Sequence, residues 1–178
     1  MYGSTFFSNN GQRTIERLGP LGPGYSIQRS ALSDLDIAGI NIMYPPTNPT
    51  PTVRTVSFRG SNNLFVSSED GRSPMNCNRT ARNRWERFTI IDEGNGLVSI
   101  MGSNGRYVSS ENGTQPMTCN KTSSGASEKF ILENQGGNNF AIKANINGRY
   151  VSSENGTKPM ICNRTSARAW EVFTMSDF

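Results

Sequence analysis

A ten-residue stretch that occurs twice in this chain limits the possible folds more than any other feature. The sequence GRYVSSENGT spans residues 105–114 and again 148–157, and a more divergent copy, NLFVSSEDGR, spans residues 63–72. The similarity continues downstream, because PMNCNRT, PMTCNKT and PMICNRT follow the three copies, and WERF, SEKF and WEVF follow in turn. A period of about 42 residues is typical of a supersecondary unit that buries its apolar face against sibling units.

Apolar residues alternate within each repeat, as in Val98 and Ile100 or Met117 and Cys119. This period of two predicts strands with one buried face. The pair Asn112-Gly113 tolerates positive φ and indicates a tight hairpin turn. We therefore predict four short strands in each repeat, and the repeats span about 53–92, 93–134 and 135–178. Three such repeats predict a closed barrel with pseudo-threefold symmetry and no long unpaired edge, with a three-bladed propeller as an unusual alternative.

Composition excludes several classes of function. The chain of 178 residues contains no histidine, which removes Ser-His-Asp systems and most catalytic zinc sites. Its net charge of +4 is not concentrated in a run of Lys and Arg, so we expect no nucleic-acid partner. No apolar segment is long enough to span a bilayer, and the N-terminus does not resemble a signal peptide. We expect a monomer without a cofactor.

The first 52 residues differ in character from the repeats. Residues 45–52 are rich in Pro and Thr and are predicted to be an extended linker. Before them, Ser33 is a candidate N-cap, and Ile37, Ile40 and Tyr44 follow with helical spacing. We predict one short amphipathic helix in this N-terminal segment.

Residues 53–178 resemble the fascin-like β-trefoil family. The resemblance rests on the pattern G-R/K-Y-V-S-x-E-N-G, then P-apolar-x-small-N-R-T, then W-E-x-F. The pattern recurs in register in three repeats, as the divergent N-L-F-V-S-S-E-D-G in the first, and Ser127 replaces tryptophan in the second. It implies an all-β trefoil of twelve strands. Members of this family bundle actin with several trefoils in one chain, or occur as single non-catalytic modules on secreted enzymes, for which glycan binding is the usual proposal.

Residues 1–44 are similar to the C-terminal end of astacin zinc metalloendopeptidases. MYGSTFFS matches the tail of that family's Met-turn, and QRSALSDLDIAGINIMYP matches its closing helix. The resemblance implies that Tyr2 corresponds to the tyrosine that can ligate zinc. The zinc-binding histidines and the catalytic glutamate are missing, so zinc belongs to the parent protein that this segment resembles, and this chain is not expected to be an enzyme.

Candidate binding residues come from polar turns and from a repeated basic position. Sugar contacts are predicted for the turns and their neighbouring arginines: Arg106, Glu111, Asn112, Arg149, Glu154 and Asn155. The alternative is that these residues only favour the turn. A basic set, Arg79, Lys121 and Arg164, could bind an acidic polymer, but we favour ion pairs with Glu86, Glu128 and Glu171, seven residues later.

The remaining repeated residues are assigned to packing. Cys77, Cys119 and Cys162 are predicted to be small core side chains rather than metal ligands or a disulfide. The repeated aromatic residues, Trp85 and Trp170 among them, are interpreted as core or capping residues, which weakens a sugar-binding hypothesis.

Two functions follow from these patterns. The first is a non-catalytic targeting module that binds a polysaccharide or a glycoprotein glycan, at the C-terminus of an astacin-like secreted protease. The alternative is binding of actin filaments by a single fascin-like trefoil.

Overall fold

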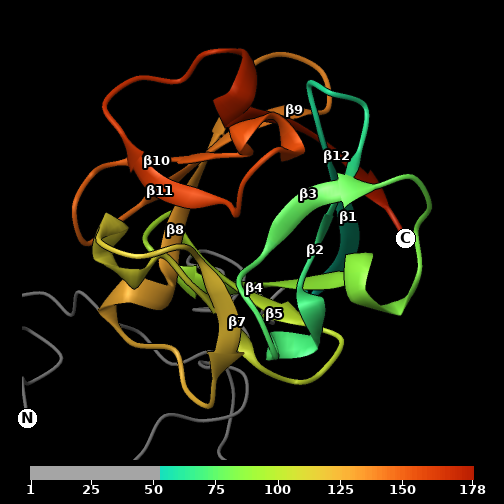
Figure 1. The fold of residues 1–178 in the computed structure, drawn as a ribbon. Coiled ribbons are helices and arrows are strands. Elements are labelled where there is room, and N and C mark those ends of the chain that lie inside the picture. Colours follow the sequence, from blue (N-terminus) through green and yellow to red (C-terminus); the bar gives the residue numbers. More distant parts are fainter. Residues whose placement is uncertain (1–52) are drawn as a thin grey trace, which may run out of the picture. The chain divides into compact units, whose positions relative to one another are not determined.

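The computed structural model describes residues 53–178. The astacin-like segment, the predicted helix and the Pro/Thr-rich linker lie outside the described residues. Figure 1 views the described part approximately along its pseudo-threefold axis.

Twelve antiparallel strands form three units of four. Unit 1 contains β1–β4, unit 2 contains β5–β8 and unit 3 contains β9–β12. Their bounds are β1 (Arg54–Gly60), β2 (Phe65–Ser67), β3 (Asn76–Arg79), β4 (Phe88–Gly94), β5 (Leu97–Gly102), β6 (Tyr107–Ser109), β7 (Thr118–Lys121), β8 (Lys129–Asn134), β9 (Asn139–Ala144), β10 (Tyr150–Ser152), β11 (Ile161–Arg164) and β12 (Val172–Asp177).

The first and last strands of the three units close a barrel. The pairs β1–β4, β5–β8 and β9–β12 alternate with pairings across unit boundaries, and β12 returns to pair with β1 over Val56–Gly60. The hairpins β2–β3, β6–β7 and β10–β11 surround the axis (Figure 1). The ring leaves the barrel without an open edge, as the repeats predict.

Six 3₁₀ helices complete the units. Three lie between the second and third strands: η1 (Glu69–Gly71), η3 (Glu111–Gly113) and η5 (Glu154–Gly156). Three precede the last strand: η2 (Arg84–Glu86), η4 (Ala126–Glu128) and η6 (Ala169–Glu171).

The predicted tight turn is wrong in one respect. Asn112 and Gly113 have φ of 53° and 73°, so the expected left-handed backbone is present. However, β6 ends at Ser109 and β7 begins at Thr118, so the pair lies in a longer connection rather than in a two-residue hairpin loop.

The core is built from side chains that recur in all three units. Phe88, Phe130 and Phe173 are buried, together with the three repeated valines, methionines and cysteines. At the axis the backbone N–H of Met75 donates to the carbonyl of Met117, Met117 donates to Met160, and Met160 donates to Met75, each at 2.9 Å. This closed ring of hydrogen bonds joins the units at the point where their core side chains meet.

The three cysteines behave as the sequence predicts. Each is fully buried and unpaired, and the thiol of Cys77 lies 3.3 Å from the carbonyl oxygen of Leu64. Burial raises the pKa of each thiol to about 11, although a hydrogen bond to a neighbouring backbone group opposes the shift. They are packing residues of the core.

Candidate functional site

The repeated basic residues pair with different carboxylates from those expected. Arg79 contacts both carboxylate oxygens of Glu69 at 2.7 Å. The equivalent pairs are Lys121 with Glu111 at 2.8 Å and Arg164 with Glu154 at 2.5 Å. The partner lies ten residues earlier in each case, because pairing of the second and third strands brings the turn glutamate back beside the end of the hairpin.

Only unit 3 retains part of the predicted contact. There Arg164 Nε lies 3.8 Å from Glu171 Oε1, in addition to its pair with Glu154. The three cations are each 39% exposed, so they remain partly accessible while their charge is offset by a carboxylate. An acidic polymer would therefore meet a neutralised pair at these positions.

The glutamates expected to pair with this basic set have another role. Glu86, Glu128 and Glu171 are buried, and each accepts a backbone N–H at the start of its 3₁₀ helix at 2.8 to 3.0 Å. The donors are Asn83, Gly125 and Arg168. These carboxylates act as helix caps that fix the outer loop of each unit against the barrel.

Glu111 and Glu154 have structural partners as well. Partial burial raises the pKa of Glu111, but hydrogen bonds from Lys121 and Thr118 outweigh this effect and hold the pKa below 4.5. Thr118 Oγ1 donates to Glu111 at 2.6 Å, and Arg164 holds Glu154. These two carboxylates are engaged within the hairpins and are therefore less available to a ligand.

The tryptophans contradict the sequence interpretation. Trp85 is 38% exposed and Trp170 is 45% exposed, so neither is a core residue. A core position would not be expected to accept Ser127 in the second unit, so the break in the repeat was a signal of exposure. The core role is therefore wrong for the two tryptophans, whereas the capping role stays a prediction.

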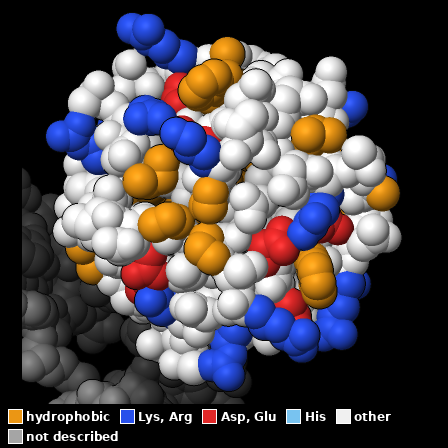
Figure 2. Space-filling view, in the orientation of Figure 1, with side chains coloured by type: hydrophobic (Ala, Val, Ile, Leu, Met, Phe, Trp, Pro, Cys, Tyr) orange, Lys and Arg blue, Asp and Glu red, His pale blue; other side chains and the backbone are white. Residues whose placement is uncertain are grey.

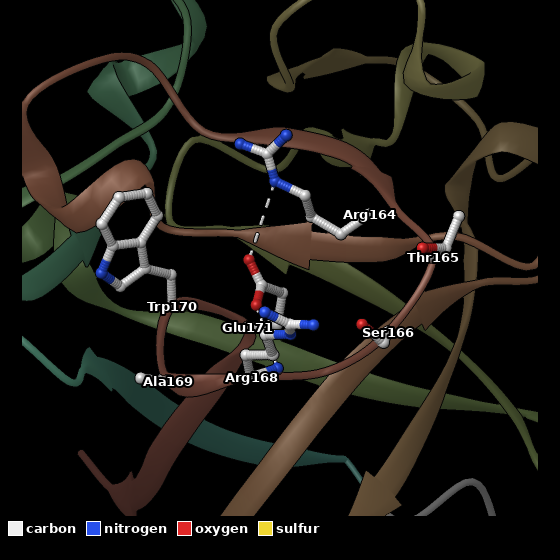
Figure 3. A pocket seen from close by; sticks show the side chains of 7 residues that line it. All are labelled: Arg164, Thr165, Ser166, Arg168, Ala169, Trp170 and Glu171. Atoms are coloured by element: carbon white, nitrogen blue, oxygen red, sulfur yellow. Dashed lines mark hydrogen bonds and ion pairs between the residues drawn. The ribbon is translucent and has the colours of Figure 1, made fainter.

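Trp170 borders an open groove on the outer loop of unit 3. The groove has a volume of about 450 Å³ and is lined by Arg164, Thr165, Ser166, Arg168, Ala169, Trp170 and Glu171. Figure 3 shows the indole at one end, the Thr165 and Ser166 side chains at the other, and Arg164 and Glu171 between them. The groove combines one apolar ring with several hydrogen-bonding groups, a combination typical of small-ligand sites.

A second, polar pocket lies between units 2 and 3. Its volume is about 410 Å³, and its lining residues are Asn112, Gly113, Asn147, Arg149 and Asn163. It brings together two predicted site residues, Asn112 and Arg149, from different repeats. From the sequence we predict that Arg149 lies beside the Glu154-Asn155 turn of its own repeat.

The other predicted turn residues occupy related junctions. Gly71, Gly113 and Gly156 lie close to the carbonyl groups of Cys119, Cys162 and Cys77, so each turn packs on the following unit. By this relation Arg106 belongs to the junction of units 1 and 2, and Asn155 to the junction of units 3 and 1. The predicted residues therefore do not form one site.

Charge on the visible face is dispersed. Figure 2 shows Lys and Arg side chains in several separate groups, some of them beside acidic side chains. Residues 53–178 contain no cluster of three or more potential metal ligands, and no helix among them is long and apolar enough to cross a membrane. Tyr2, the residue matched to the astacin zinc ligand, lies outside the described residues.

Comparisons with known proteins identify the fold. No protein-family model matches the chain, and the search of curated proteins found no match. The designed threefold-symmetric protein ThreeFoil aligns with a TM-score of 0.63 and 13% identity over 70% of this chain and 99% of ThreeFoil.

Two lectin structures align comparably. SeviL, bound to asialo-GM1 saccharide, gives a TM-score of 0.60 and 10% identity over 71% of this chain and 98% of its own. The Polyporus squamosus lectin, bound to Neu5Aca2-6Galb1-4GlcNAc, gives 0.60 and 12% identity over 70% of this chain and 49% of its own. At such low identity the likeness concerns the fold alone, and this chain contains a β-trefoil.

Proposed function

We propose that residues 53–178 form a non-catalytic glycan-binding module whose principal site is the groove beside Trp170. The observation that carries this proposal is the exposure of Trp170, at 45%, within a groove that also presents hydroxyl and guanidinium groups. An indole that is nearly half exposed on a rigid barrel offers a flat apolar surface on which a ligand ring can stack.

The chemistry of the groove suits a sugar. One face of a pyranose ring is apolar and can stack on an indole, while its hydroxyl groups need hydrogen-bond partners. Thr165, Ser166 and Arg168 supply such partners and are exposed, and Arg164 is held in place by Glu154 and Glu171. The capped 3₁₀ helix η6 fixes the backbone that carries Trp170, which limits the ordering entropy of the loop on binding.

Units 1 and 2 have fewer of the features that make the groove of unit 3 a candidate sugar site. Unit 1 has an exposed tryptophan, Trp85, at the equivalent position, which makes it a secondary candidate. Unit 2 has Ser127 there and offers no ring. The structural neighbours that are bound to saccharides support glycans as the ligand class, since the same fold carries such sites in those proteins.

The wider context is also a proposal. The resemblance of residues 1–44 to the end of an astacin protease, followed by the linker at 45–52, supports a targeting tail of a secreted zinc metalloendopeptidase. In that setting the trefoil would hold the protease on a glycan-bearing substrate. Zinc would belong to the parent's catalytic domain.

A glycan array followed by calorimetry tests the module. We expect retention on a subset of glycans and at least about a tenfold loss of affinity in Trp170→Ala, since central aromatic residues dominate such sites. Ser127→Ala, at the equivalent position of unit 2, is the matched control and should retain affinity. Absence of binding to any glycan, or binding that Trp170→Ala does not weaken, would contradict the proposal.

Actin remains the alternative function, and the same protein distinguishes it. Co-sedimentation with actin filaments should show no binding if the module recognises glycans. Saturable binding to filaments, combined with a negative glycan array, would replace the glycan proposal with the actin function.

A further inference from the structure

The junction of units 2 and 3 differs from the other two junctions in its charge. In each junction a left-handed turn of one unit packs on the carbonyl of a cysteine in the next, and an added Cβ on the turn glycine would lie 2.4 to 2.5 Å from that oxygen. The backbone framework is therefore the same three times, and the side chains around it can be compared directly.

Arg149 distinguishes the junction of units 2 and 3 from the other two junctions. At the junction of units 1 and 2, the turn residue is Asp70, which pairs with Arg72 at 3.2 Å. At the junction of units 3 and 1, the residue related to Arg149 is Leu64. Only the junction of units 2 and 3 has both an arginine on the receiving unit and an uncharged turn residue, Asn112.

The walls of this pocket carry no acidic group. Its lining residues are three asparagines, Arg149 and Gly113. Among residues 53–178, no carboxylate lies within 4.0 Å of a charged nitrogen of Arg149. An arginine without an acid partner, surrounded by amides, favours an anion that also carries hydroxyl groups.

The pocket is also preorganised. Asn112 has φ of 53° and ψ of 19°, the same left-handed conformation as Asp70 and Asn155 in the other two units. On the opposite wall, the backbone N–H of Arg149 donates to Asn147 Oδ1 at 2.9 Å and fixes the loop that bears the arginine. Asn163, which lines this pocket, lies on β11 next to Arg164, which lines the Trp170 groove.

We propose that this pocket binds the acidic group, carboxylate or sulfate, of a glycan. The inference rests on the proposed glycan-binding function and narrows the ligand to acidic glycans. Arg149 would contact the anionic group, while the amides of Asn112, Asn147 and Asn163 would hydrogen-bond to neighbouring hydroxyls.

A matched pair of sugars tests the inference. Methyl β-D-glucuronide and methyl β-D-glucoside differ only in a carboxylate in place of a hydroxymethyl group. In NMR titrations of the full chain, the glucuronide should shift the side-chain signals of Asn112, Asn147, Asn163 and Arg149 Nε, and it should bind roughly threefold to tenfold more tightly than the glucoside.

Two variants localise the effect. Arg149→Leu copies the residue found at the related position of unit 1 and should remove the preference for the glucuronide. Arg106→Leu, at the junction that contains Asp70, is the control and should keep it. Equal affinity of the wild type for the two sugars, or a preference that survives Arg149→Leu, would overturn the inference.

A third ligand separates glycans from simple anions. Inorganic sulfate at the same ionic strength should bind more weakly than the glucuronide, because it lacks the hydroxyl groups that the asparagines hold. If sulfate alone reproduces the glucuronide shifts at equal affinity, the glycan part of the inference is wrong. Failure of the proposed function would be seen separately, as a Trp170 indole signal that no glycan from the array perturbs.

Discussion

The interior of the trefoil and its outer loops come from the same three repeats, yet they differ in how well the repetition is kept. Around the axis, phenylalanine, methionine, valine and cysteine each occur three times at equivalent buried positions. On the outer loops, units 1 and 3 present an exposed tryptophan where unit 2 has Ser127. The difference teaches that residues kept in all three units of this chain report packing, whereas exposed residues kept in only some units are candidates for binding.

The largest effect is expected at a junction between units. Gly113→Ala should destabilise the chain by about 3–4 kcal/mol, because Gly113 has φ of +73° and a Cβ there would lie 2.4 Å from the Cys162 carbonyl oxygen. Gly105 has nearly the same φ, +72°, but no atom within 4 Å of the added Cβ. Gly105→Ala should therefore cost only about 1–2 kcal/mol.

Chemical denaturation of the two variants measures this difference. Equal losses of stability would mean that the junction is not closely packed, and that backbone strain alone explains the glycine. The junctions between units would then not count as closely packed interior, in contrast to the outer loops.

A smaller effect is expected at the caps of the outer loops. Glu171→Ala should cost about 2 kcal/mol, because Glu171 is buried and accepts the backbone N–H of Arg168 at 3.0 Å. Asp177→Ala removes an exposed ion pair with Arg54 and should cost less than about 0.5 kcal/mol. Thermal unfolding of both variants checks the order, and a reversal would show that the cap does not anchor the loop.

The cysteines should give no reaction at all in the folded protein. With a pKa of about 11, only about 0.1% of each thiol is ionised at pH 8, and all three are fully buried. Iodoacetamide should therefore label none of them in the native state and all three in urea, as read by mass spectrometry. Rapid labelling of any one of them under native conditions would place that cysteine outside the core.

Because the pKa of each cysteine thiol is raised in the folded state, the stability of the protein should fall at high pH. An unfolded thiol ionises near 9.0, below the folded value, so the unfolded state loses its protons first as the pH rises. The contribution of the thiols to stability is complete below pH 9 and declines between pH 9 and about 11.

Much of the fold could be predicted from the sequence. The period of two in Val98 and Ile100 and the positive φ of Asn112-Gly113 follow from local patterns, and symmetry then implies a closed barrel. The ion pairs could not be predicted, because the contact of Arg79 with Glu69 depends on the register of β2 with β3. The pocket of Asn112 and Arg149 depends on contacts between units, which spacing within one repeat does not contain.

The most direct test of binding at a departure from symmetry uses the two tryptophans of the chain. In Trp85→Phe the only remaining indole is Trp170, so its fluorescence reports on the groove alone. A glycan selected on the array should change this emission with the affinity that calorimetry gives. Binding detected by calorimetry without any change in Trp170 emission would contradict the account and place the ligand elsewhere on the trefoil.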